Sequence, residues 1–296
     1  MVTQRFLGGA WASIHGPPDP QTFLVWVLDN AFAGLGVGPG PRDVPWRQLR
    51  HALGDLPVQI AAVRVGSVLE LPADGEGNLA STHAGDRDTA VARIRDAVEL
   101  ARHLGCSRVV LEPGVARVAE EHGPDDICDA ACTPEKATIE LTRRDTSLDA
   151  ALDAYCRALF ELCRVFDDME FCLPTGRHVR SLGDPVAISQ VFEDLAGARL
   201  SYWHDVALAA RHQELFGTPQ GEWLEMFSNR MSGMTLGDYG GGEIYLPPGA
   251  GGVDYQLVGS YRRRQGNPIP AVVELAPAVD PSELPGVHAF LSKHGL

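Results

Sequence analysis

The chain has 296 residues, of which 45% are hydrophobic and 22% charged, so it can bury the core of one large α/β domain. Its formal net charge is −14 at pH 7, from 25 Lys and Arg against 39 Asp and Glu. This charge would repel a phosphate backbone, which argues against nucleic acid as a partner. We see neither a basic segment followed by an apolar run at the N-terminus nor a stretch of ~20 apolar residues. We therefore expect a cytoplasmic protein that does not enter a membrane.

The first quarter of the sequence alternates predicted strands with predicted helices. Residues 5–13 form a candidate strand, residues 21–30 a helix, and residues 33–37 a second strand. A short helix at 46–53 precedes residues 58–65, whose continuous apolar run is typical of a strand buried on both faces. The pattern indicates β-then-α units.

The next unit is the clearest in the chain and is followed by an insertion. Residues 70–86 are rich in Gly, Asp and Ser, which predicts a loop long enough to cover a site. Residues 88–104 carry apolar side chains at helical spacing, and Gly105 ends that helix before an apolar strand at 108–112. Residues 113–145 are predicted to be an irregular insertion.

The rest of the chain repeats the same alternation. The expected elements are a helix at 148–166, a strand at 169–173, a helix at 185–195, a strand at 199–203, helices across 207–227, a strand at 231–236, a helix at 253–263, a strand at 271–275 and a closing segment at 281–294. About eight such units favour a (β/α)8 TIM barrel over an open doubly wound sheet. The sequence therefore predicts a single barrel domain over residues 1–296.

Polar residues end several of the predicted strands. His204 and Asp205 close the segment Leu-Ser-Tyr-Trp-His-Asp, and Glu274 closes Ala-Val-Val-Glu. Asp238 and Glu112 lie at or just beyond two other strand ends. Because active sites of TIM barrels lie at the carboxyl ends of the strands, we expect these side chains on one rim.

Three segments carry a resemblance to a known family. Residues 202–205 (YWHD), 246–254 (LPPGAGGVD) and 272–274 (VVE) resemble the xylose-isomerase-like TIM barrels, the sugar phosphate isomerase and epimerase superfamily. The likeness extends over most of the chain, through the helix at 88–104 and the strand at 108–112. The resemblance implies an isomerase or epimerase fold and activity.

The resemblance also implies a metal site. Members hold one divalent metal (Mn, Mg or Zn) with Glu, Asp, His and Glu after strands five to eight, where the metal polarises a carbonyl while two Glu residues move a proton. Asp205 and Glu274 match the sixth and eighth positions. They are the candidate metal ligands, and the resemblance makes Glu274 a catalytic candidate.

The other two positions depart from the family pattern. Pro174 stands where the fifth-strand Glu belongs, and Thr235 stands where the seventh-strand His belongs. Three compensations stay open: Glu112 could supply the missing carboxylate, His204 could bend into the site, and Asp238 could replace the nitrogen ligand with oxygen.

The candidate site therefore has catalytic and substrate-binding members. Glu274 and Glu112 are the catalytic candidates. The substrate-binding candidates are His15, His204, Arg177 and Asp238, where Arg177 could bind a phosphate or carboxylate. Structural roles compete with each assignment, since Asp205 could cap a helix, Glu274 could pair with an Arg, and His15 could be solvated.

Two functions from different classes remain open. The first is an isomerase or epimerase that moves a proton on a small polyhydroxylated or carbonyl substrate at the carboxyl rim of the barrel. The second is a catalytically altered barrel that binds a small ligand or a protein partner. Association into a homo-oligomer stays open in both.

Overall fold

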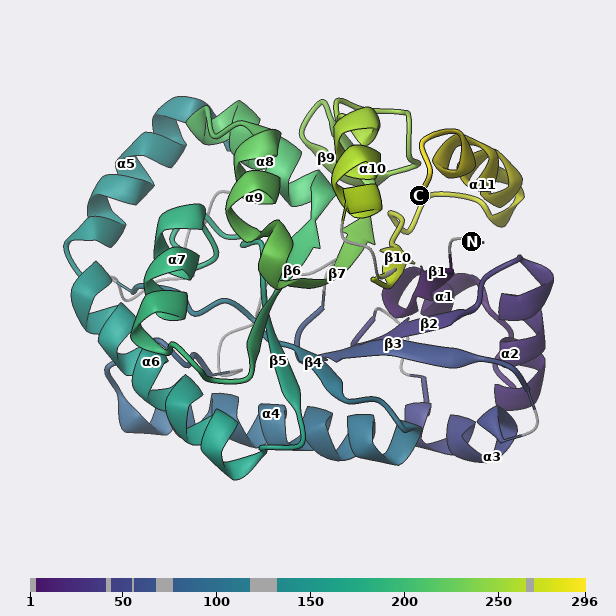
Figure 1. Ribbon diagram of the computed structural model, residues 1–296, viewed down its shortest axis with the longest axis horizontal. Coiled ribbons are helices and arrows are strands. Elements are labelled where there is room, and N and C mark those ends of the chain that lie inside the picture. The colour runs from purple at the N-terminus through teal and green to yellow at the C-terminus, as the bar shows by residue number, and fades with distance from the viewer. Residues whose placement is uncertain (1–3, 41–43, 55, 68–76, 118–131, 265–268) are drawn as a thin grey trace.

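A computed structural model describes residues 4–40, 44–54, 56–67, 77–117, 132–264 and 269–296 (Figure 1). Its centre is a closed barrel of eight parallel strands in the order β1, β10, β7, β6, β5, β4, β3, β2. These strands are β1 (Arg5–Gly8), β2 (Gly34–Val37), β3 (Gln59–Arg64), β4 (Arg108–Val110), β5 (Glu170–Pro174), β6 (Leu200–Asp205), β7 (Met231–Leu236) and β10 (Ala271–Val273). The predicted (β/α)8 barrel is confirmed.

Helices surround the barrel on its outer side (Figure 1). Their bounds are α1 (Gly9–His15), α2 (Pro20–Asp29), α3 (Leu49–Leu53), α4 (Ala84–Leu104), α5 (Pro134–Asp145), α6 (Leu148–Val165), α7 (Pro185–Asp194), α8 (Val206–Phe216), α9 (Gln220–Phe227), α10 (Tyr255–Arg264) and α11 (Leu284–Lys293). Short 3-10 turns lie at Trp46–Gln48, Ser228–Arg230 and Pro281–Glu283. None of the described helices is long and apolar enough to cross a membrane.

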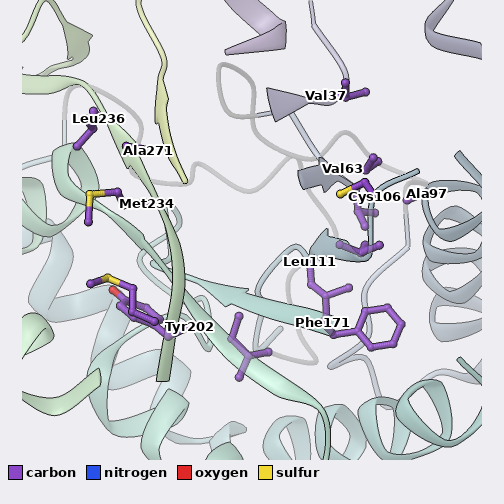
Figure 2. Packing of buried hydrophobic residues seen from close by; sticks show 14 of the residues in the cluster. Val37, Val63, Ala97, Cys106, Leu111, Phe171, Tyr202, Met234, Leu236 and Ala271 are labelled. Carbon is purple, nitrogen blue, oxygen red and sulfur yellow. The ribbon is translucent and has the colours of Figure 1, made fainter. Parts of the chain in front are cut away.

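The strands separate two apolar layers, one inside the barrel and one between strands and helices, because successive side chains of a strand point to opposite faces. Trp203 and Cys172 belong to a small buried cluster with residues of other barrel strands. The larger cluster lies between strands and helices, where Figure 2 shows Phe171 and Tyr202 among its members. Every residue of β6 is buried, as expected for a strand covered on both faces.

The strand register brings the predicted rim residues to one level. Asp205 of β6 pairs with Thr235 of β7, and Val273 of β10 pairs with Leu236 of β7. The backbone N–H of Glu274 donates to the carbonyl of Leu236 at 2.9 Å. The ends of β6, β7 and β10 are thereby fixed beside one another.

The first strand is shorter than predicted. We expected a strand over residues 5–13, but β1 ends at Gly8 and α1 begins at once. Residues 9–15 are apolar in the first four positions and buried from Gly9 to Ser13, so their pattern fits either element. The short helix turns the chain over the rim of the barrel.

Two further elements were not expected. An antiparallel hairpin, β8 (Asp238–Gly240) and β9 (Glu243–Leu246), follows β7. The stretch at 113–145, predicted to be irregular, contains α5, which Thr133 caps by accepting from the N–H of Lys136. Residues 118–131 of that stretch, and 70–76 of the predicted loop at 70–86, lie outside the described residues.

Candidate active site

Glu274 follows β10 directly and is 3% exposed. Its Oε1 accepts from the backbone N–H of Trp11 at 2.9 Å. Burial raises the pKa of the Glu274 carboxyl to about 7, while the Trp11 hydrogen bond and the positive charge of Arg64 act in the opposite direction. The carboxyl can therefore exist in both protonation states near neutral pH, as proton transfer requires.

Gly8 makes room for this carboxylate. A Cβ atom at position 8 would lie 2.1 Å from Oε2 of Glu274. The backbone of β1 therefore approaches the carboxylate more closely than any residue with a side chain would allow. The site needs glycine at this position.

Asp205 ends β6 and has no exposed surface. One carboxylate oxygen accepts from the N–H of Leu208, so Asp205 caps α8. The other oxygen accepts from the hydroxyl of Tyr245 at 2.9 Å. Burial raises the pKa of Asp205, and the charge of Arg64 together with these hydrogen bonds opposes that rise. Asp205 therefore has a capping role within a buried polar cluster.

Tyr245 brings the β8–β9 hairpin onto this cluster. Its side chain is 1% exposed, and its backbone has φ of 61°, a left-handed conformation that is uncommon for tyrosine. Its carbonyl accepts from the N–H of Ala276 at 2.7 Å. The hairpin is thus anchored to the segment after β10, and the tyrosine hydroxyl covers one oxygen of Asp205.

Arg64 supplies positive charge to both acids. It is the last residue of β3, and its Nη1 lies 3.4 Å from Oγ1 of Thr235. The same Oγ1 accepts from Nε1 of Trp203 at 2.9 Å. The guanidinium lowers the pKa of Asp205 and of Glu274, which places it within electrostatic reach of both carboxyls.

A cavity of about 60 Å³ lies at the ends of β3, β4 and β5, which we call the β3–β5 cavity. Its wall includes Arg64, Glu112, Pro174, Arg177, His178 and Tyr245. Arg64 and Tyr245 therefore belong both to this cavity and to the surroundings of the buried acids. The predicted candidates Arg177 and Glu112 meet here.

Glu112 forms a salt bridge with an arginine of α4. Its Oε2 lies 2.7 Å from Nη1 of Arg93, a residue of α4, and both side chains are 24% exposed. Gly66 lets the carboxylate approach, because a Cβ there would lie 1.9 Å from its Oε1. Glu112 therefore lies on the wall of the cavity while its carboxylate is held by an ion pair with α4.

Asp238 organises a loop through both of its carboxylate oxygens. It has no exposed surface, and its Oδ1 accepts from the N–H groups of Tyr239 and Val253. Its Oδ2 accepts from the N–H of Gly249 at 2.8 Å. This geometry accounts for Asp238 as a structural group, since its oxygens hold the segment at 246–254, and a role of Asp238 as an oxygen ligand stays a prediction.

His204 and His15 are not brought to the two acids. His204 lies on the helix-facing side of β6, where its Nδ1 is 2.9 Å from the hydroxyl of Tyr202. Burial lowers its pKa to about 3, so the ring is neutral. The suggestion that it bends into the site is corrected: it stays opposite to Asp205 on the strand. His15 ends α1, and its Nε2 is 3.0 Å from the carbonyl of Pro277.

The sequence matches no protein-family model and no curated protein. Solved structures do match. A D-tagatose 3-epimerase-like protein superposes with a TM-score of 0.72 at 16% identity, over 98% of this chain and 96% of its own. The chain has the xylose-isomerase-like barrel fold. A protein named as a xylose isomerase from Rhodospirillum rubrum gives 0.70 at 13% identity over 98% of both chains.

Another match to the xylose-isomerase-like fold is 3-keto-D-glucoside 4-epimerase from E. coli. Its TM-score is 0.68 at 12% identity, covering 99% of this chain and 100% of that one. The resemblance stated from the sequence is confirmed at the level of the fold. At such identities chemistry has to be argued from the residues of this chain.

The residues of this xylose-isomerase-like barrel do not fit the divalent-metal site that the resemblance implies. Pro174 has no side-chain donor, the hydroxyl of Thr235 already accepts a hydrogen bond, and both oxygens of Asp205 are occupied. In the described part of the chain, no group of three or more His, Cys, Asp or Glu is arranged to hold a metal. Asp205 and Glu274 are instead neighboured by the cation of Arg64.

Three site residues were missed by sequence reasoning. Arg64 lies near the end of the apolar run at 58–65, and its role at the site depends on the two acids that barrel closure brings near it. Tyr245 lies on the hairpin that the sequence did not predict. His178 follows Arg177 directly, but the sequence does not show that its ring is buried. In each case the signal depends on neighbours that are distant in the sequence.

Proposed function

We propose that this protein transfers a proton on a small polyhydroxylated carbonyl substrate, as an isomerase or epimerase does, with Glu274 as the proton-carrying group. The proposal is supported most by the surroundings of Glu274. The carboxyl is buried at a strand end of the carboxyl rim, and its pKa is about 7. Sugar epimerases share this fold and support the same class of substrate.

This chemistry needs a base to remove the proton and a positive group to stabilise the negative charge that develops on the substrate oxygen. An ionised Glu274 would remove the proton from the carbon next to the carbonyl, and the carbonyl oxygen would gain negative charge as an enediolate forms. Arg64, which acts electrostatically on Glu274, would stabilise that oxygen. Returning the proton to the neighbouring carbon, while the proton of the neighbouring hydroxyl passes to the former carbonyl oxygen, isomerises the substrate. Epimerisation needs in addition a second acid that protonates the same carbon from the opposite face. No step of this proposal passes through a metal ion.

Glu112 has a different place in the proposal. Its carboxylate is already engaged in a salt bridge with Arg93, so it is less available for proton transfer than Glu274. We assign it to orienting a substrate hydroxyl at the β3–β5 cavity, which it lines. Replacing Glu112 should therefore weaken substrate binding more than it slows proton transfer.

A second candidate function is a barrel that binds a ligand without turning it over. The hydrogen bonds of Tyr245 and Leu208 to Asp205 favour it, because they occupy a carboxylate that the family uses for chemistry. In that reading the carboxyl of Glu274 is a structural group.

The variant Glu274→Gln separates the two candidates. Turnover on a panel of small ketoses, aldoses and keto acids should fall ~100-fold or more, because the amide keeps the shape but cannot accept the proton. The matched control Glu193→Gln changes an exposed carboxylate of α7 and should leave turnover unchanged. A folded Glu274→Gln protein with wild-type turnover would exclude the catalytic role of Glu274, whereas ligand binding without any turnover in the natural protein would favour the second candidate.

A further inference from the structure

His178 carries a buried N–H group that no described residue accepts. The side chain is 6% exposed, and its Nδ1 accepts from the backbone N–H of Arg180 at 2.9 Å. Burial and the charges of Arg180 and Arg211 lower the pKa of the ring to about 3, so the ring is neutral near pH 7. Because Nδ1 is the acceptor, the ring proton is on Nε2. This Nε2 is buried and makes no hydrogen bond within the described structure.

The ring is fixed by a turn at residues 178–181. The backbone N–H of Ser181 donates to the carbonyl of His178 at 3.0 Å, which closes the turn. Helix α8 holds the chain just before it, where Nη1 of Arg211 donates to the carbonyl of Arg177 at 2.7 Å. The position of the Nε2–H is therefore set before a ligand arrives, which reduces the entropy lost on binding.

The β3–β5 cavity, which His178 lines, also has an acceptor on its wall. Glu112 lines the same cavity, and its carboxylate oxygens accept from Arg93. An ionised carboxylate has about four acceptor sites, so it can serve more than one donor. The wall therefore combines a neutral N–H with a carboxylate oxygen. A hydroxyl group suits this pair, because it can accept from the first and donate to the second.

The charges of the wall favour an uncharged group over an anion. The positive charge of Arg64 acts on the buried acids Asp205 and Glu274. Arg177 has further interactions within the described structure. A carboxylate or phosphate that reached the cavity would approach the carboxylate of Glu112, and like charges repel. The donor that remains, the N–H of His178, is neutral and needs only an oxygen lone pair.

The volume of the cavity limits the group to the end of a molecule. A cavity of about 60 Å³ has room for about four water-sized atoms. A hydroxymethyl group fits within this volume. The rest of a small sugar would extend beyond the cavity along the rim.

We propose that the β3–β5 cavity binds an uncharged hydroxyl end group of the substrate, and that His178 determines this specificity by donating from Nε2. The substrate is then a sugar that has neither a phosphate nor a carboxylate at the end held in the cavity. The proposal deepens the proposed function, and it rests on that function only for the reaction that follows binding. Arg64 connects the two places, since it lines the cavity and also acts on Glu274.

Three methyl ketones that differ in one group test the choice of ligand. Hydroxyacetone carries a hydroxymethyl group, butanone has an ethyl group in its place, and pyruvate has a carboxylate. The protein is isotopically labelled in its histidine rings, and NMR follows the Nε2 signal of His178 as each compound is added near neutral pH. We expect hydroxyacetone to move this signal. At equal concentration, the other two should move it less than roughly a fifth as far, because neither offers an uncharged hydroxyl.

Two substitutions at one position separate the donor from the turn. His178→Asn keeps an acceptor for the N–H of Arg180 but lacks the Nε2–H, and should weaken hydroxyacetone binding roughly fivefold or more. His178→Gln carries an N–H group at the distance of Nε2 but loses the acceptor, and should stay within roughly twofold of the natural affinity. The control His51→Asn changes an exposed residue of α3 and should leave binding unchanged. Ligand-observed NMR titration gives the affinities.

A purely structural His178 would give the opposite order, with binding kept in His178→Asn and lost in His178→Gln. The proposal is overturned by that order, by a His178 signal that hydroxyacetone does not move, or by pyruvate or butanone moving it as far. Should a variant fail to fold, the titration of the natural protein still decides, and the other variant assigns the signal. Each of these readouts is independent of whether Glu274 transfers a proton, so the two proposals can fail separately.

Discussion

At the scale of single residues, the pKa of the Glu274 carboxyl is set by opposing influences. Removal from water favours its neutral form, and the nearby charge of Asp205 adds to that effect. The N–H of Trp11 and the guanidinium of Arg64 favour its charged form. The balance leaves a pKa of about 7 instead of the ordinary 4.5. A carboxyl with this value is suited to gain and lose a proton at neutral pH.

The raised pKa predicts a pH-dependent stability difference between the protein and Glu274→Gln. Because the folded state binds this proton more tightly than the unfolded state, the free energy of unfolding falls as pH rises from 4.5 to about 7. The fall should be about 3 kcal/mol and should be missing in the Gln variant. Urea denaturation across this range measures both proteins. Parallel profiles would mean that the pKa of Glu274 is not raised.

At the scale of elements, the loop at 246–254 is held to β8 by one buried side chain. Asp238 accepts hydrogen bonds from the amides of Tyr239, Gly249 and Val253. Gly251 packs closely against it, since a Cβ there would lie 2.6 Å from Oδ1 of Asp238. This explains a Gly-rich turn without invoking a ligand.

Asp238→Ala should destabilise the protein by about 3 kcal/mol or more, because several buried amides lose their acceptor at once. Asp238→Asn keeps one acceptor oxygen in place and should lose less. Chemical denaturation gives the free energies, and limited proteolysis shows whether cleavage starts within residues 246–254. An Ala variant as stable as the natural protein would speak against the organising role of Asp238.

The barrel elements were predictable because their signals are local. The helix at Ala84–Leu104 has an apolar stripe and ends at Gly105, whose φ is 76°, and continuous apolar runs marked strands such as β3. The β8–β9 hairpin was not predictable, because its residues alternate weakly and Tyr245 adopts a positive φ that only its tertiary contacts support. For the same reason α1 was merged with β1, since both are apolar and buried.

The candidate site was predictable to a lesser degree. Strand-end position indicated Asp205 and Glu274, and the structure places both at the carboxyl rim. The chemistry of these two acids depends on Tyr245 and Arg64. Both partners come close to the acids only when the barrel closes. The direction of His204 follows from the alternation of β6, which the contact with Tyr202 reinforces.

At the scale of the whole molecule, barrel closure joins the beginning and end of the chain around the site. β1 pairs with β10 and β2, so Gly8 and Trp11 meet Glu274 from the other end of the sequence. The barrel also buries three neutral histidines at or near its carboxyl side, namely His178, His204 and His212. Burial lowers their pKa values to about 3, 3 and 4.

These histidines predict acid sensitivity. Their folded pKa values lie below the ordinary 6.5, so the stability they contribute is complete above pH 6.5 and is lost as pH falls toward 4. By pH 5 each of the three histidines should lower the free energy of unfolding by about 2 kcal/mol. Urea midpoints of Glu274→Gln, which lacks the opposing carboxyl, measure the effect between pH 7 and 5. A flat profile would show that the folded and unfolded states take up protons equally, and therefore that the histidine pKa values are not lowered.

The most direct test of the account is hydrogen exchange at the carbon next to the carbonyl of a bound substrate. The protein is incubated in deuterated water with each small sugar or sugar acid that binds it, and NMR follows loss of that carbon-bound proton. We predict incorporation that rises with pH through about 7 and falls ~100-fold or more in Glu274→Gln, with Glu193→Gln unchanged. Exchange at the wild-type rate in a folded Glu274→Gln protein would contradict the account, as would substrate binding with no exchange in the natural protein.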